Sequence, residues 1–265
     1  MAIDHFELCI KPSPTDIVWR YMNLKKFESI LRHKALFFCR ADRFADPFEG
    51  SIPKREAEYR LEERRKISYY FGNEFTPSKA KKSIESISNL HIRFKKQHVI
   101  NCWHTNNNEN DSMWRLYLDS NEGIAIKTTV GNLISSFLAT KESLNISSVR
   151  YLNYETDIWY DAKIYPVQSY NMFVPLVHKR IEFKHEEEVR LIHSIKTDLN
   201  LDEFWNSQPH SCGINIAVNV NTLIDEIYTP PTCDDKQLEK VQKILNKYNF
   251  DFRILKSGLT NNPYY

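Results

Sequence analysis

One short segment constrains the fold of this chain more than any other, because charged and apolar side chains are interleaved in it. Residues 179–192 place acidic and basic side chains around a short apolar run. If residues 185–193 form a strand, successive side chains point to opposite faces. One face would then carry Val189 and Leu191 into a core. The other would carry three charged side chains, those of Glu186, Glu188 and Arg190.

Two carboxylates and a guanidinium on one face are the elements of a catalytic site. Repulsion between the carboxylates can raise the pKa of one while the other stays ionised. The same segment also fits a solvated helix, in which Glu186 and Arg190 form an ordinary ion pair four residues apart. Four of its residues recur at helical spacing: Ile181, His185, Val189 and Ile192. Both interpretations stay open at this point.

Length and composition narrow the class of protein. A chain of 265 residues, 42% of them hydrophobic, can build a large core. Its net charge of +2 indicates no general affinity for nucleic acid, although local basic faces can exist. The chain lacks the loops G-x-x-x-x-G-K-[ST] and G-x-G-x-x-G, which argues against the common nucleotide-binding motifs.

Cysteines and apolar runs narrow the class further. The five cysteines form no C-x-x-C pair, so neither a disulfide framework nor a zinc knuckle is predicted. Residues 185–189 begin like a zinc-protease helix but carry Val189 where a second histidine is needed, and we expect no metal site. Residues 1–20 hold no apolar signal-peptide core, and no apolar run reaches membrane-spanning length. We therefore expect a cytoplasmic protein with no membrane partner.

Strand-like and helix-like segments mix along the chain without a strict βαβ order, which favours the α+β class. We expect a single domain over residues 1–265, with a mixed or antiparallel sheet at its core. Residues 54–70 and 78–98 look like charged helices between two core strands. Residues 53–98 are therefore predicted to form a helical insertion or lid. Its basic side chains could contact a phosphate backbone, but a solvated helix face is the simpler interpretation.

Residues 40–50 are the second segment dense in charge. Pro47 and Gly50 favour a turn here. Four charged side chains lie among two phenylalanines, namely Arg40, Asp42, Asp46 and Glu49. They would either line a cleft or brace the loop by bonding to one another and to the backbone.

Aromatic residues gather at and after a strand predicted over residues 99–104. Four rings could line one pocket: Trp103, His104, Trp114 and Tyr117. Two tryptophans and a tyrosine so close together favour a flat ligand. Each could instead be a core aromatic, and His104 a hydrogen-bonded residue at the end of the strand.

Taken together, these motifs resemble a widespread bacterial domain-of-unknown-function family. The resemblance extends over about residues 17–257 and implies no activity. It rests on five motifs: Trp19-Arg20-Tyr21, the 38–50 block Phe-Cys-Arg-Ala-Asp-Arg-Phe-Ala-Asp-Pro-Phe-Glu-Gly, Cys102-Trp103-His104, Met113-Trp114-x-x-Tyr117, and Lys179-Arg180 followed by Glu186-x-Glu188-Val189-Arg190.

The order of the motifs also resembles that of ADP-ribosyltransferases, including small prokaryotic toxins. In that fold a basic residue lies on an early strand, and a catalytic glutamate lies on a late strand, often as E-x-E. Arg20 would take the first role and Glu186-x-Glu188 the last. Residues 102–104, Cys-Trp-His, stand where the middle motif reads Ser-Thr-Ser, and this is the departure from the pattern.

The second resemblance implies chemistry on NAD. Loss of nicotinamide generates an oxocarbenium-like ribose, which Glu188 would stabilise with Glu186 beside it, while Arg20 binds a phosphate or ribose. An aromatic residue would stack on nicotinamide. The further candidates for cofactor binding are Tyr21, Arg40, Trp103, His104, Trp114 and Tyr117.

Two other classes of function remain as alternatives. A non-catalytic nucleic-acid- or protein-binding module needs only a continuous basic face. A metal-dependent nuclease would hold Mg²⁺ with carboxylates drawn from Asp42, Asp46, Glu49, Glu186 and Glu188. As a transferase, the protein would suit a toxin or phage-defence effector with an antitoxin or sensor partner. Its target macromolecule, nucleic acid included, stays open.

Overall fold

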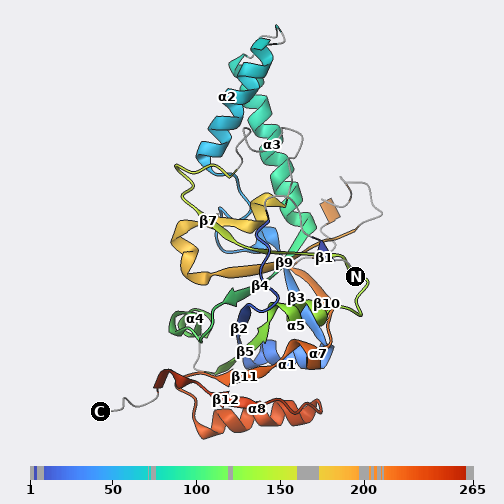
Figure 1. Cartoon of the computed structure of the whole chain (residues 1–265). Coiled ribbons are helices and arrows are strands. Elements are labelled where there is room, and N and C mark those ends of the chain that lie inside the picture. Colours follow the sequence, from blue (N-terminus) through green and yellow to red (C-terminus); the bar gives the residue numbers. More distant parts are fainter. Residues whose placement is uncertain are drawn as a thin grey trace, which may run out of the picture.

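The computed structural model describes residues 3–4, 9–70, 72, 76–118, 122–159, 173–196, 203, 206–207, 210 and 212–260. Within these residues, ten strands join one sheet (Figure 1). In chain order they are β1 (Ile3–Asp4), β2 (Ile17–Asn23), β3 (Ala35–Arg40), β4 (His98–Thr105), β5 (Gly123–Thr129), β6 (Leu144–Ser148), β9 (Glu188–Ser194), β10 (Gly213–Ala217), β11 (Glu226–Thr229) and β12 (Ile254–Lys256). A separate parallel pair is formed by β7 (Arg150–Leu152) and β8 (His178–Arg180).

The sheet is mixed. Its order is β1-β6-β9-β4-β2-β5-β11-β12, with β3 beside β4 and β10 beside β3. The pairs β1–β6 and β11–β12 are parallel, and the other neighbours are antiparallel. The predicted α+β class with a mixed or antiparallel sheet is therefore confirmed.

The helices α1 (Leu24–His33), α4 (Asp111–Tyr117), α5 (Val130–Ser135), α7 (Val220–Leu223) and α8 (Asp235–Lys247) accompany the sheet. The first shows how the sequence specifies them. Asn23 ends β2 and starts α1, because its side-chain oxygen accepts a hydrogen bond from the Lys26 backbone N–H at 3.0 Å. The apolar stripe that follows enters the core through Phe27, Ile30 and Leu31.

Two long helices, α2 (Lys54–Tyr70) and α3 (Pro77–Gln97), separate β3 from β4 in the chain. They lie side by side and project away from the sheet (Figure 1). They match the predicted helical insertion to within one residue. Because β3 and β4 still pair, the insertion leaves the sheet order intact. The helices of the described part are all too short or too polar to cross a membrane.

The middle of the sheet is forked. One edge of β4 pairs with β9 along seven residues. The opposite edge pairs with β3 through Val99 and Ile100, and with β2 only through His104 and Thr105. Meanwhile β2 pairs with β5 along its whole length. Residues 101–103 of β4 therefore face the gap between two diverging strands, and Arg20 of β2 follows directly after the last residue paired with β4.

The strand expected over residues 185–193 begins later than predicted. Residues Ile181–Glu186 form a 3₁₀ helix, η3, and β9 starts only at Glu188. The reason is the backbone of Glu187, whose φ of 39° is left-handed and bends the chain sharply. Val189 and Leu191 do enter the core, as the strand interpretation required, and the helical interpretation is wrong for residues 188–194.

Candidate active site

Glu188 and Arg190 lie on one face of β9 and bond to each other. Nε of Arg190 donates to Oε2 of Glu188 at 2.7 Å, and its Nη2 donates to Oε1 at 3.2 Å. Charge-assisted pairs of this kind fix the planes of both groups. The expected carboxylate and guanidinium therefore share one face.

Three more charged residues complete a buried cluster. Lys179 of β8 donates from Nζ to Oε1 of Glu188 at 2.8 Å and also bonds to Glu186. Glu49, from the loop after β3, accepts from Nη1 of Arg190. All five side chains belong to residues that are at most 7% exposed. The cluster thus holds three carboxylates and two cations, and a proton on one carboxylate would make it neutral.

The two carboxylates of the E-x-E motif differ in acidity. Burial, the hydrogen bond to Glu188 and the charge of Glu188 together raise the pKa of Glu186 to about 7, against an opposing effect of Lys179. Burial would also raise the pKa of Glu188, but Arg190, Glu186 and Lys179 together outweigh that effect and hold its pKa well below the ordinary value. At neutral pH, Glu188 is ionised and Glu186 is partly protonated. This is the asymmetry that neighbouring acid and base groups need.

The loop at residues 40–50 is tied down by ion pairs. Arg40 bonds to both oxygens of Asp42, at 2.8 and 2.7 Å, and its Nη1 donates to the His210 carbonyl at 2.8 Å. Asp46 pairs with Arg180, at 2.8 and 3.2 Å. With Glu49 bound to Arg190 in the cluster, the loop is fastened to the E-x-E-V-R segment. Arg40 therefore braces the loop, since all its side-chain nitrogens have partners outside the candidate site.

Arg20 has an unused donor. Its side chain lies over the ring of Trp103, with 5.7 Å between Cζ and the ring centroid. Nη1 of Arg20 is buried and has no hydrogen-bond partner among the described residues. Burial lowers the pKa of this guanidinium, but an arginine keeps its charge at neutral pH. A buried cation with an open donor is costly without a compensating group, so the position suits an anion.

His104 has an unused acceptor. Its Nδ1 lies 2.7 Å from the carbonyl oxygen of Glu186, and a carbonyl can only accept, so Nδ1 carries the proton. Burial lowers the pKa of His104, which keeps the ring neutral. Nε2 is then a lone-pair acceptor, and it is buried without a partner among the described residues. It suits a ligand hydroxyl.

Tyr117, the last residue of α4, lies near Arg20 and the two glutamates. Burial raises the pKa of its hydroxyl, and three nearby groups raise it further: Cys102, Glu186 and Glu188. The charge of Arg20 opposes that increase. Because such effects decline with distance, the hydroxyl lies near both Arg20 and the two glutamates. The ring of Tyr117 is 42% exposed, so a ligand can reach it.

The other aromatic candidates lie inside the protein. Trp103 is 1% exposed, and its Nε1 donates to Oδ1 of Asn101 at 2.7 Å. Trp114 is 3% exposed, and its Nε1 donates to Glu109 at 3.0 Å. Tyr21 packs edge-on against Trp114, with ring centroids 4.9 Å apart. These three rings are buried, whereas Tyr117 is exposed.

The described residues contain no group of three or more His, Cys, Asp or Glu side chains that could hold a metal ion. The carboxylates named for a nuclease are instead engaged by cations: Asp42 by Arg40, Asp46 by Arg180, and the three of the buried cluster by Lys179 and Arg190.

The sequence placed Lys179 in the last family motif without giving it a role, and it did not indicate Tyr151. Lys179 lies between both glutamates, and the hydroxyl of Tyr151 accepts the Glu188 backbone N–H at 2.9 Å. The basic pair at residues 179–180, directly before an acidic run, was the available signal for Lys179. The sequence offered no comparable signal for Tyr151, because its position depends on the pairing of β7 with β8.

Comparison with known proteins agrees with the first resemblance. A family model described as a protein of unknown function, DUF2971, matches residues 113–191, which include the M-W-x-x-Y helix and the E-x-E-V-R strand. No curated protein matches the chain. Among solved structures, Thermus sp. 2.9 DarT in complex with ADP-ribosylated ssDNA is similar over 93% of this chain and 96% of that chain, at 10% sequence identity and a TM-score of 0.38. A likeness this distant carries no argument about function, which has to be argued from the site itself.

Proposed function

We propose that the protein is an ADP-ribosyltransferase-like enzyme that consumes NAD, with Glu188 as the catalytic carboxylate. The observation that carries this proposal is the pair of unsatisfied buried atoms, Nη1 of Arg20 and Nε2 of His104. One is a cationic donor and the other a neutral acceptor. A phosphate would satisfy the first atom, and a sugar hydroxyl would satisfy the second.

Each residue then has a physical role. Arg20 binds the diphosphate, Nε2 of His104 accepts a ribose hydroxyl, and the exposed ring of Tyr117 stacks on nicotinamide. When the C–N bond to nicotinamide breaks, its electron pair leaves with nicotinamide and positive charge develops on the ribose. The ionised carboxylate of Glu188 stabilises that charge. Lys179 and Arg190 fill about three of its four acceptor positions, and Glu186 bonds to it as well, so a ribose hydroxyl would take the place of the Glu186 contact.

Glu186 fits the role of general base. A group whose pKa is about 7 can take a proton from the attacking nucleophile and release it again near neutral pH. Its bond to Lys179 positions it beside Glu188 without neutralising it fully.

The test is incubation of purified protein with radiolabelled NAD, alone and with cell lysate, while nicotinamide release and label transfer are measured. Glu188→Gln and Arg20→Gln should each lower turnover at least about 100-fold, in line with the loss of a transition-state contact. Glu142→Gln and Arg115→Gln, whose side chains are 45% and 80% exposed and lie outside the cluster, should match wild type. Melting curves establish that each variant is folded. A folded wild type that neither binds nor cleaves NAD would sink the proposal.

The helical insertion supports nucleic acid as a partner of the same protein. Residues 54–97 contain twelve Lys or Arg and six Asp or Glu, while the rest of the chain contains 24 and 28. The insertion is thus basic on an otherwise acidic protein. At the far end of α2, Tyr69 and Tyr70 are 87% and 83% exposed, and exposed aromatic rings are platforms for unpaired bases. Fluorescence anisotropy with labelled single-stranded oligonucleotides tests this partner.

A further inference from the structure

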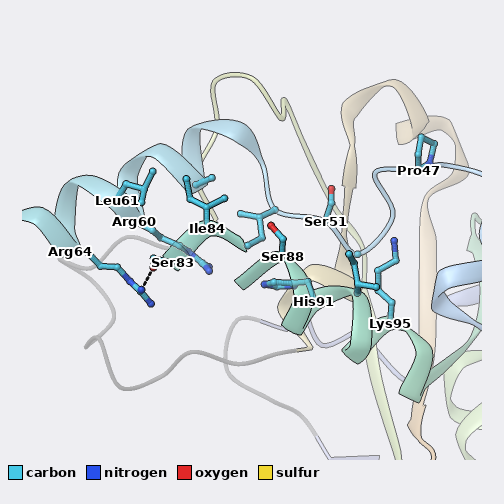
Figure 2. Close-up of a pocket in the computed structure, with 14 residues that line it drawn as sticks. Pro47, Ser51, Arg60, Leu61, Arg64, Ser83, Ile84, Ser88, His91 and Lys95 are labelled. Carbon is cyan, nitrogen blue, oxygen red and sulfur yellow. Dashed lines mark hydrogen bonds between the residues drawn. The ribbon is translucent and has the colours of Figure 1, made fainter. Parts of the chain in front are cut away.

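A cavity of about 330 Å³ lies where α2 and α3 meet the loop at residues 47–52 (Figure 2). That volume is within the range of pockets that hold small organic ligands. The cavity is separate from the site described above, since Arg20, His104 and Tyr117 do not line it. Both helices and the loop contribute side chains to its wall, so the cavity depends on the packed insertion.

The wall has two chemically distinct parts. Aliphatic side chains from both helices cover one part, among them Leu61, Ile84 and Ile92. Three cations form the other part: Arg60, Arg64 and Lys95. Among the described residues that line the cavity there is no Asp, Glu, Phe, Tyr or Trp, and the one ring is the imidazole of His91. The cavity therefore combines an apolar surface with a positive field and lacks the large aromatic rings that stack on a nucleobase.

Two neutral polar groups add directional contacts. Oγ of Ser51 is buried and has no hydrogen-bond partner among the described residues. Burial, with the charges of Arg60 and Lys95, lowers the pKa of His91 to about 4, so this ring is neutral at pH 7. Figure 2 shows Ser51, His91 and Lys95 at the end of the cavity near the loop. A hydroxyl, a neutral imidazole and an ammonium there can bind a small anionic head group.

The three cations are not equally neutralised within the protein. Arg60 pairs at 2.8 Å with Glu56, which is fully buried. Arg64 contacts the neutral hydroxyl of Ser83. The stem of Lys95 lies against Gly50, since a Cβ at that glycine would be 3.1 Å from Cγ of Lys95. Lys95 thus places positive charge beside the loop without a carboxylate on the cavity wall to balance it.

We propose that this cavity binds a small amphipathic anion, an aliphatic body carrying one phosphate or carboxylate group. The head group would sit at Lys95 and Ser51, and the aliphatic body would lie against Leu61, Ile84 and Ile92. The positive charge of the cavity favours an anionic head group, and the aliphatic side chains favour an apolar body. The site is independent of the proposed NAD chemistry, but its floor is the loop that holds Glu49 on Arg190.

Isothermal titration calorimetry on the full chain, without NAD, tests the proposal. The probes are octyl phosphate and octanoate. The controls are inorganic phosphate, which is the head group alone, and octylamine, which has the same chain with a cationic head group. Wild type should bind at least one of the two anions, and at least about tenfold more tightly than either control, because only the amphipathic anion suits both parts of the wall. Octylamine that binds as tightly as the anions would overturn the proposal.

Matched variants locate the binding. Lys95→Gln should weaken binding about tenfold, while Lys96→Gln, on the same helix outside the cavity, should leave it unchanged. Ser88→Phe projects a ring into the cavity and should abolish binding, whereas Ser86→Phe, at a position that does not line it, should not. Circular dichroism verifies that the variants fold. The proposal is wrong if folded wild type binds neither anion, or if Lys95→Gln and Ser88→Phe both bind like wild type.

Discussion

At the residue scale, Glu186 gives the site its sharpest pH dependence. Its pKa is raised from 4.5 to about 7 in the folded protein, so the native state binds this proton more tightly than the unfolded state does. Stability from this group is therefore fully present below about pH 4.5 and is lost as pH rises through about 7.

Glu186→Gln removes that titration. Relative to wild type, the variant should gain on the order of 3 kcal/mol in the free energy of unfolding between pH 5 and pH 9. Urea unfolding at both pH values measures the change. Glu187→Gln, an exposed neighbour, should follow wild type at both. If the difference in stability between wild type and Glu186→Gln is the same at pH 5 and pH 9, Glu186 has an ordinary pKa.

Substitutions of Tyr117 distinguish ring stacking from hydrogen bonding in the proposed site. Tyr117→Phe keeps the ring and should change the KM for NAD less than about threefold, whereas Tyr117→Ala should raise it about tenfold through loss of a stacking contact. Steady-state kinetics of nicotinamide release measures both. Tyr117→Trp offers a larger ring and should stay near wild type. Equal KM values for the Phe and Ala variants would remove the ring from NAD binding.

At the element scale, the loop at residues 40–50 and the E-x-E-V-R segment form one unit. Glu49→Gln leaves Arg190 buried with one carboxylate fewer, and should cost about 3–5 kcal/mol of stability. Asp46→Asn breaks a pair whose side chains are 29% exposed at Arg180 and 5% exposed at Asp46, and should cost less than Glu49→Gln. Chemical denaturation compares the two. Similar losses would mean that the buried cluster adds no more than the partly exposed pair.

The sequence predicts local elements, but it does not predict the ion pairs between them. The cap at Asn23 and the stripe Phe27, Ile30 and Leu31 specify α1 within a dozen residues. By contrast, Glu49 and Arg190 are 141 positions apart, and several other carboxylates could have paired with that arginine as well. The start of β9 was misplaced because only the folded chain requires Glu187 to adopt a left-handed backbone.

At the scale of the whole molecule, the candidate site depends on the fork in the sheet. The sequence indicated Arg20, Glu186, Glu188 and Tyr117, which the structure brings into one neighbourhood. It could not indicate that β2 and β3 share one edge of β4, which leaves residues 101–103 without a strand partner on that edge. It also could not separate Trp103 and Trp114, which are buried, from Tyr117, because the three rings look equally suited to a pocket.

The helical insertion is basic and the rest of the chain is acidic, and the salt dependence of nucleic-acid binding tests whether the insertion is the binding surface. If single-stranded nucleic acid binds along α2 and α3, its affinity should fall as salt rises, with a slope of log K against log salt that reports the number of phosphates engaged. Replacing Lys79, Lys81 and Lys82 by Gln should reduce that slope by about 2, since each phosphate contact contributes about 0.7 for single strands.

The matched control replaces three lysines of α8, Lys236, Lys240 and Lys243, which lie on a different helix. It changes the net charge of the protein by the same amount, so a field that acted through total charge alone would weaken binding equally in both triple variants. Only a field concentrated on the insertion predicts different slopes. Equal slopes in the two variants, or affinity independent of salt, would rule out the insertion as the nucleic-acid surface.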